Sequence, residues 1–139
     1  MPSISLSGDW TGVYDYADAA HLEPVTFHAS LTDIAGVIWG TSTEKSTQRD
    51  SDAMLEASLN GSRSAREVRF RKVYTSDMPG GELPIDYAGV LSADGNRITG
   101  HWRFFIASPH PGGPFVMNRH PVKEAEVIRQ LSAMIEMKG

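Results

Sequence analysis

The feature that most constrains the fold of this chain is a regular alternation of short turns and long loops between eight β-like runs. Along the runs, which extend to about residue 119, apolar and polar residues alternate, most cleanly from Pro24 to Thr32. This period of two is typical of strands with one buried face. Because short and long connections alternate, the short turns are expected at one end of a meander and the long loops at the other.

The positions of the connections suggest how the strands are arranged. The short turns, rich in Gly, Asn and Asp, are predicted near residues 33–36, 60–65 and 92–96. The long loops are predicted at residues 17–24, 45–52, 76–84 and 107–114. Closing such a meander removes the exposed edges that invite aggregation. The sequence therefore predicts an all-β fold, an eight-stranded antiparallel up-and-down β-barrel, with a two-sheet sandwich as the alternative.

The end of the chain has a different period. From Val122 to Met137, apolar residues recur at helical spacing, and Pro121 suits the first turn of a helix. We therefore expect an amphipathic C-terminal α-helix over residues 121–137, packed on the outside of the barrel. With 139 residues and no linker-like stretch, residues 1–139 are expected to form a single domain.

Composition narrows the classes of partner and cofactor. The net charge of −4 and the mixed charges predict no nucleic-acid or membrane partner. The lack of cysteine excludes disulfides, thiolate catalysis and sulfur-ligated zinc. The histidines lack zinc-like spacing, and no metal site or cofactor is predicted. Residues 1–5 do not resemble a signal peptide, and no apolar run reaches membrane-spanning length, so a cytoplasmic location is expected.

Side chains predicted to face the interior form an aliphatic floor beneath the short turns and an aromatic mouth beneath the long loops. The mouth also carries hydroxyl groups and one amine, which suits a pocket for a small, largely apolar ligand. The residues predicted to bind this ligand are Tyr14, Tyr16, Trp39, Lys72, Tyr74, Tyr87, Trp102, Phe104 and Phe115. The pattern identifies no catalytic residue.

The same residues allow other interpretations. Buried aromatic residues fill volume in any core, and Lys72 could extend its ammonium group out of the mouth. An enzyme of the cyclase, isomerase or decarboxylase type, acting on a hydrophobic molecule in the same cavity, is the alternative function. His110, in the last long loop, is a candidate haem ligand or proton shuttle.

Gly8-Asp9-Trp10 in the first run and Arg119 at the end of the last carry a resemblance to a known group of proteins. Lipocalin-like barrels begin with Gly-x-Trp, whose indole packs over the floor beneath an arginine from the last strand. In this feature, and in the predicted helix after the last strand, the chain resembles the calycins, which include lipocalins, avidins and fatty-acid-binding proteins. The resemblance implies the barrel architecture and a structural pairing of Trp10 with Arg119.

Outward-facing residues suggest two further features. A homodimer could form through apolar outward positions at Val13, Val73, Phe105 and Val116. Three outward arginines are expected to form solvated cross-strand pairs with acidic neighbours: Arg69, Arg71 and Arg103, with Glu67 and Asp86.

Overall fold

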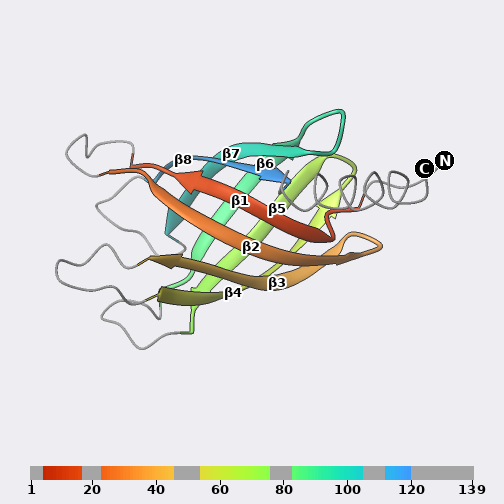
Figure 1. Cartoon of the computed structure of the whole chain (residues 1–139). Coiled ribbons are helices and arrows are strands. Elements are labelled where there is room, and N and C mark those ends of the chain that lie inside the picture. Colours follow the sequence, from red (N-terminus) through yellow and green to blue (C-terminus); the bar gives the residue numbers. More distant parts are fainter. Residues whose placement is uncertain (1–4, 17–22, 46–53, 76–82, 105–111, 120–139) are drawn as a thin grey trace, which may run out of the picture.

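A computed structural model describes residues 5–16, 23–45, 54–75, 83–104 and 112–119. Eight antiparallel strands close into one barrel, in which β1 pairs with β8 and every other pairing joins consecutive strands (Figure 1). The strands are β1 (Gly8–Tyr14), β2 (Val25–Ile34), β3 (Val37–Lys45), β4 (Met54–Ser64), β5 (Glu67–Tyr74), β6 (Ile85–Leu91), β7 (Arg97–Phe104) and β8 (Gly113–Arg119). The predicted up-and-down barrel is confirmed, and the expected helix at 121–137 lies outside the described residues.

One predicted turn is wrong in position. The sequence predicts a turn beginning at Asn60-Gly61, but β4 continues to Ser64 and the chain reverses at Ala65-Arg66. Gly61 instead allows β4 and β5 to lie close together, because a Cβ added there would lie 1.9 Å from the backbone oxygen of Arg69 on β5. Glycine inside a strand often marks such a contact, so the Asn-Gly pair here is not a hairpin signal.

Strand β3 has the opposite phase to the prediction. The sequence predicts that Trp39 faces the interior together with Val37, but these side chains are 42% and 58% exposed. The two-residue turn at Ala35-Gly36 pairs Ile34 with Val37, and this register turns the even-numbered positions of β3 inward. A shift of one residue moves every side chain of a strand to the other face. The inward placement of Trp39 is therefore wrong.

Trp10 and Arg119 close the end of the barrel that carries the short turns. Trp10 is fully buried, and its Nε1 donates a hydrogen bond of 2.9 Å to the carbonyl oxygen of Leu6. The guanidinium carbon of Arg119 lies 4.6 Å from the centroid of the Trp10 ring system. Arg119 also donates to the carbonyl oxygens of Ser7 and Gly95. These contacts confirm the expected pairing and join the segment before β1 to the β6–β7 turn.

A second polar contact at this end involves Asp33, which is buried near the end of β2. Its Oδ2 accepts hydrogen bonds of 2.9 Å from the backbone nitrogen of Leu6 and from Nε of Arg63. Its Oδ1 accepts a bond of 3.0 Å from the backbone nitrogen of Gly36. Burial alone would raise the pKa of Asp33, but these three donors outweigh it and hold the pKa below its usual value.

Replacing Asp33 with alanine should lower the free energy of unfolding by about 2 kcal/mol at neutral pH, because the donors lose their acceptor. The pKa of Asp33 is lower in the folded state than the unfolded value of about 3.9. Its contribution is therefore fully present above that pH and is lost as the pH falls through the folded-state pKa. Urea unfolding of the wild type and Asp33→Ala should give a difference that shrinks in strongly acidic buffer, and a pH-independent difference would contradict this account.

Candidate functional site

A buried ion pair lies inside the half of the barrel that faces the long connections. Nζ of Lys72 on β5 lies 2.5 Å from Oε1 of Glu44 on β3, and the two residues are 1% and 3% exposed. Lys72 shares the inward face of β5 with Val68 and Phe70. The predicted inward placement of Lys72 is confirmed, and the ammonium group meets a carboxylate rather than solvent.

Two tyrosine hydroxyls share the same carboxylate. Tyr14 at the end of β1 donates a hydrogen bond of 2.6 Å to Oε2 of Glu44. Tyr74 at the end of β5 donates one of 3.0 Å to Oε1. Together with Lys72, three donors from two strands converge on one buried carboxylate. We call Glu44, Lys72, Tyr14 and Tyr74 the interior cluster.

Glu44 is the residue of this cluster that the sequence analysis missed. A glutamate near the end of a strand is expected on the solvent side, where its charge stays hydrated. The signal that could have identified it is the turn at Ala35-Gly36, because counting from a two-residue hairpin places Glu44 on the same face as Ile38.

Aromatic rings surround the ammonium group of Lys72. Its Nζ lies 4.8 Å from the ring centroid of Tyr74, 5.0 Å from that of Tyr14 and 5.3 Å from that of Phe27. The ring of Tyr87 lies 5.8 Å away. Cation–π attraction is strongest where water is excluded. The rings and Glu44 therefore compensate jointly for the loss of hydration.

Burial shifts the pKa values of the interior cluster. It lowers the pKa of Lys72, although the neighbouring Glu44 carboxylate acts in the opposite direction. It raises the pKa values of Tyr14 and Tyr74, and the nearby charge of Glu44 adds to the increase. Both phenols therefore remain protonated at neutral pH and act as hydrogen-bond donors.

Closer to the long connections, further aromatic rings pack edge-on. The ring centroids of Tyr16 and Trp102 are 5.4 Å apart, and those of Trp102 and Phe104 are 5.6 Å apart. Nε1 of Trp102 donates a hydrogen bond of 2.8 Å to the carbonyl oxygen of Asp15. Tyr16, Tyr74 and Phe104 are only partly buried and pack against the core. They form the accessible rim of the described interior.

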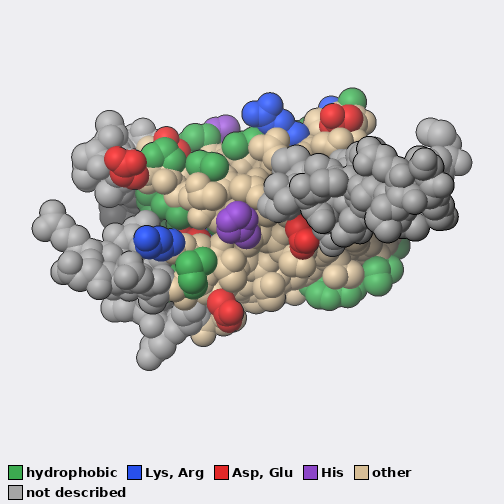
Figure 2. Space-filling model, viewed as in Figure 1, with side chains coloured by type: hydrophobic (Ala, Val, Ile, Leu, Met, Phe, Trp, Pro, Cys, Tyr) green, Lys and Arg blue, Asp and Glu red, His purple; other side chains and the backbone are tan. Residues whose placement is uncertain are grey.

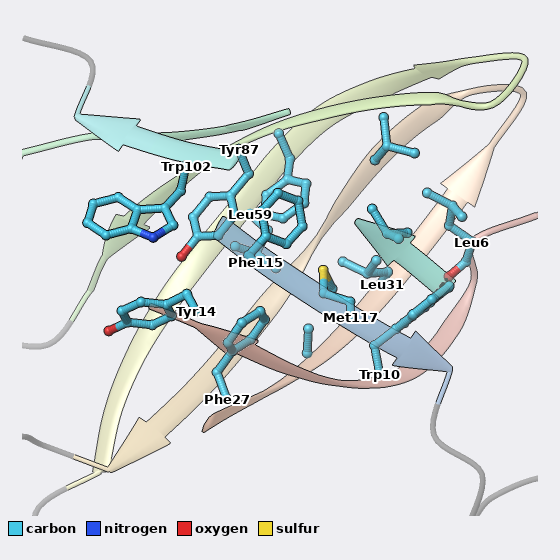
Figure 3. Packing of buried hydrophobic residues seen from close by; sticks show 14 of the residues in the cluster. Leu6, Trp10, Tyr14, Phe27, Leu31, Leu59, Tyr87, Trp102, Phe115 and Met117 are labelled. Carbon is cyan, nitrogen blue, oxygen red and sulfur yellow. Dashed lines mark hydrogen bonds between the residues drawn. The ribbon is translucent and has the colours of Figure 1, made fainter. Parts of the chain in front are cut away.

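The remaining predicted residues lie deeper in the same core. The rings of Tyr87 and Phe115 are buried, with centroids 4.9 Å apart. Figure 3 shows Trp102, Tyr87 and Tyr14 grouped at one end of the core and Trp10 with Leu6 at the other. The structure therefore brings together all the predicted ligand-binding residues except Trp39, which lies on the outer surface.

The chemistry of the interior cluster is that of hydrogen-bond donors around a carboxylate. Within the described ranges, no group of three or more His, Asp or Glu residues is placed to hold a metal ion. The same ranges contain no helix of the length and hydropathy needed to cross a membrane. His110 lies outside the described residues.

Comparison of the chain with protein-family models, curated proteins and solved structures finds no match.

Proposed function

We propose that this protein binds a small, largely apolar ligand inside its barrel, and that the ligand enters from the end with the long connections. The buried interior cluster carries this proposal. A buried ion pair is a poor source of stability, because apolar residues of similar volume often stabilise a core equally well or better. Polar groups with shifted pKa values inside an apolar interior are characteristic of binding and catalytic sites.

The balance of donors and acceptors favours a ligand that carries an acceptor. The carboxylate of Glu44 already accepts from three donors. Within the described residues, Lys72 uses one of its N–H groups on Glu44, and an ammonium group has about three to offer. A carbonyl or carboxylate on the ligand would complement Lys72, while its apolar part would pack against Tyr16 and Phe104.

The architecture supports a calycin-like assignment. A closed eight-stranded barrel of this size holds side chains or one small ligand. The contact between Trp10 and Arg119 at one end leaves the opposite end, with its partly buried aromatic rim, as the proposed entrance. On this proposal the floor has a structural role and the rim selects the ligand.

Two fluorescent probes that differ by one sulfonate group test this function. Anilinonaphthalene sulfonate should bind saturably and more tightly than the neutral phenylnaphthylamine, because only the sulfonate offers an acceptor to Lys72. Phe104→Ala should weaken the binding of both probes about tenfold, since a ring contact of the rim is lost. Trp39→Ala is the control and should leave both affinities unchanged, because Trp39 lies outside the barrel. Absence of saturable binding of either probe would overturn the proposal.

One observation favours a second candidate, an enzyme acting on a hydrophobic molecule inside the barrel. Glu44 accepts hydrogen bonds from Lys72 and Tyr14 through its two oxygens. When one of these groups loses a proton to a substrate, another can supply a proton through Glu44. Mass spectrometry of a ligand incubated with the protein should then show a product that forms with the wild type and not with Lys72→Met. Full turnover by Lys72→Met would exclude Lys72 as the catalyst.

A further inference from the structure

The outer face of β4 to β7 carries a hollow of about 740 Å³ that lies on the solvent side of the sheet, separate from the interior cluster. Its charged side chains are Arg69, Arg71, Asp86 and Arg103, and His101 also lines it. By contrast, few Lys or Arg side chains are visible on the face over β1 to β3 in Figure 2. Arg69 and Arg71 of β5 and Arg103 of β7 therefore surround one concave region.

Strand register arranges these side chains in two neighbouring rows across the sheet. One row contains Arg69 on β5, Ala88 on β6 and His101 on β7. The other contains Arg71, Asp86 and Arg103 on the same three strands. Side chains directly opposite one another on a sheet face lie within contact distance. Ala88, the smallest side chain of the six, leaves open space between Arg69 and His101.

The charges within the hollow are not balanced. Asp86 pairs with Arg71, with Nε and Oδ1 2.9 Å apart. The guanidinium groups of Arg69 and Arg103 form no ion pair or hydrogen bond with any described residue, so the expected pairing of all three arginines with acidic neighbours is wrong for these two. Three arginines and one aspartate leave a local charge of +2 on a protein whose net charge is −4.

We propose that this hollow binds the phosphate group of a small organic phosphate. A guanidinium group matches the oxygens of a phosphate with paired N–H donors, and a phosphate dianion balances the excess charge of Arg69 and Arg103. The volume of the hollow lies in the range of small-molecule sites and exceeds that of a bare phosphate ion, which leaves room for an organic group over Ala88. Binding on this open face is expected to weaken as salt is added.

Nuclear magnetic resonance titrations with glycerol phosphate and with glycerol test this site. Glycerol phosphate should shift the signals of Arg69, Ala88 and Arg103 saturably, and glycerol should not. The shifts are read at residues of the outer hollow, so the result is independent of the function proposed for the barrel interior. The double variant Arg69→Gln/Arg103→Gln should raise the dissociation constant by about tenfold or more, because two charge-assisted contacts are lost.

A charge-matched control separates a built site from a general attraction to positive charge. Arg66→Gln/Arg97→Gln removes the same charge from positions that do not line the hollow and should leave the dissociation constant nearly unchanged. Equal weakening in both double variants would overturn the proposal, as would the absence of shifts with glycerol phosphate. Tighter binding of a DNA duplex, with the same dependence on Arg69 and Arg103, would also overturn it by assigning the face to a nucleic acid.

Discussion

Glu44→Leu is expected to lower the free energy of unfolding by about 3–5 kcal/mol, the cost of leaving the Lys72 ammonium group buried without its counter-ion. The double variant Glu44→Leu/Lys72→Met should recover most of this loss, because no unpaired charge then remains inside the barrel. Urea unfolding of the wild type, both single variants and the double variant gives the coupling between the two positions. We expect the coupling to be of the same order as the loss in the single variant.

The exposed pair between Arg71 and Asp86 provides a matched control. Its side chains are 44% and 32% exposed, so Asp86→Asn should cost less than about 1 kcal/mol. If Glu44→Leu lowered the free energy of unfolding no more than Asp86→Asn, the conclusion that the interior cluster is shielded from water would be wrong. The stable double variant also tests function, because it should lose the preference for the sulfonate probe over the neutral one.

Trp10→Ala is expected to cost about 3–5 kcal/mol, which is typical of removing a fully buried large ring. The loss includes the packing of the indole, its hydrogen bond to Leu6 and its contact with Arg119. Thermal and urea unfolding of the variant should show a marked decrease in stability.

Trp39→Ala is the control for Trp10→Ala, because it deletes the same side chain from a position that is 42% exposed. It should change the free energy of unfolding by no more than about 0.5 kcal/mol, as is typical of surface substitutions. Under conditions where the Trp10→Ala variant is folded, this variant should bind the fluorescent probes with the same affinity as the wild type, since Trp10 lies at the closed end. Equal losses of stability in the two variants would contradict the assigned positions of the two tryptophans.

The barrel could be predicted because its signals are local and agree with one another. Apolar and polar residues alternate from Val25 to Thr32 in β2 and from Glu67 to Arg71 in β5, so the inward face of Lys72 follows from Val68 and Phe70. The connections repeat the same order of short and long, which leaves few topologies open.

The phase of β3 could not be predicted from alternation, because Val37-Ile38-Trp39 places apolar side chains on both faces. Only the geometry of the preceding turn decides between the faces. Alternation therefore predicts the interior cluster without its acceptor, Glu44, and does not identify the carboxylate that accepts from the hydroxyls of Tyr14 and Tyr74. The sequence also could not predict which outer arginine pairs with Asp86. Strand register places Asp86 beside both Arg71 and Arg103, and the structure shows it bonded to Arg71.

The pairing of β1 with β8 has a consequence for how the chain folds. Every other strand pairing joins neighbours in sequence, but the hydrogen bond from Arg119 to Ser7 spans 112 residues. Contacts of such large sequence separation form late, because the chain loses much entropy before they contribute. During synthesis the growing sheet therefore carries an unpaired β1 edge until β8 has left the ribosome. The chain is therefore most exposed to aggregation in the interval before β1 and β8 pair.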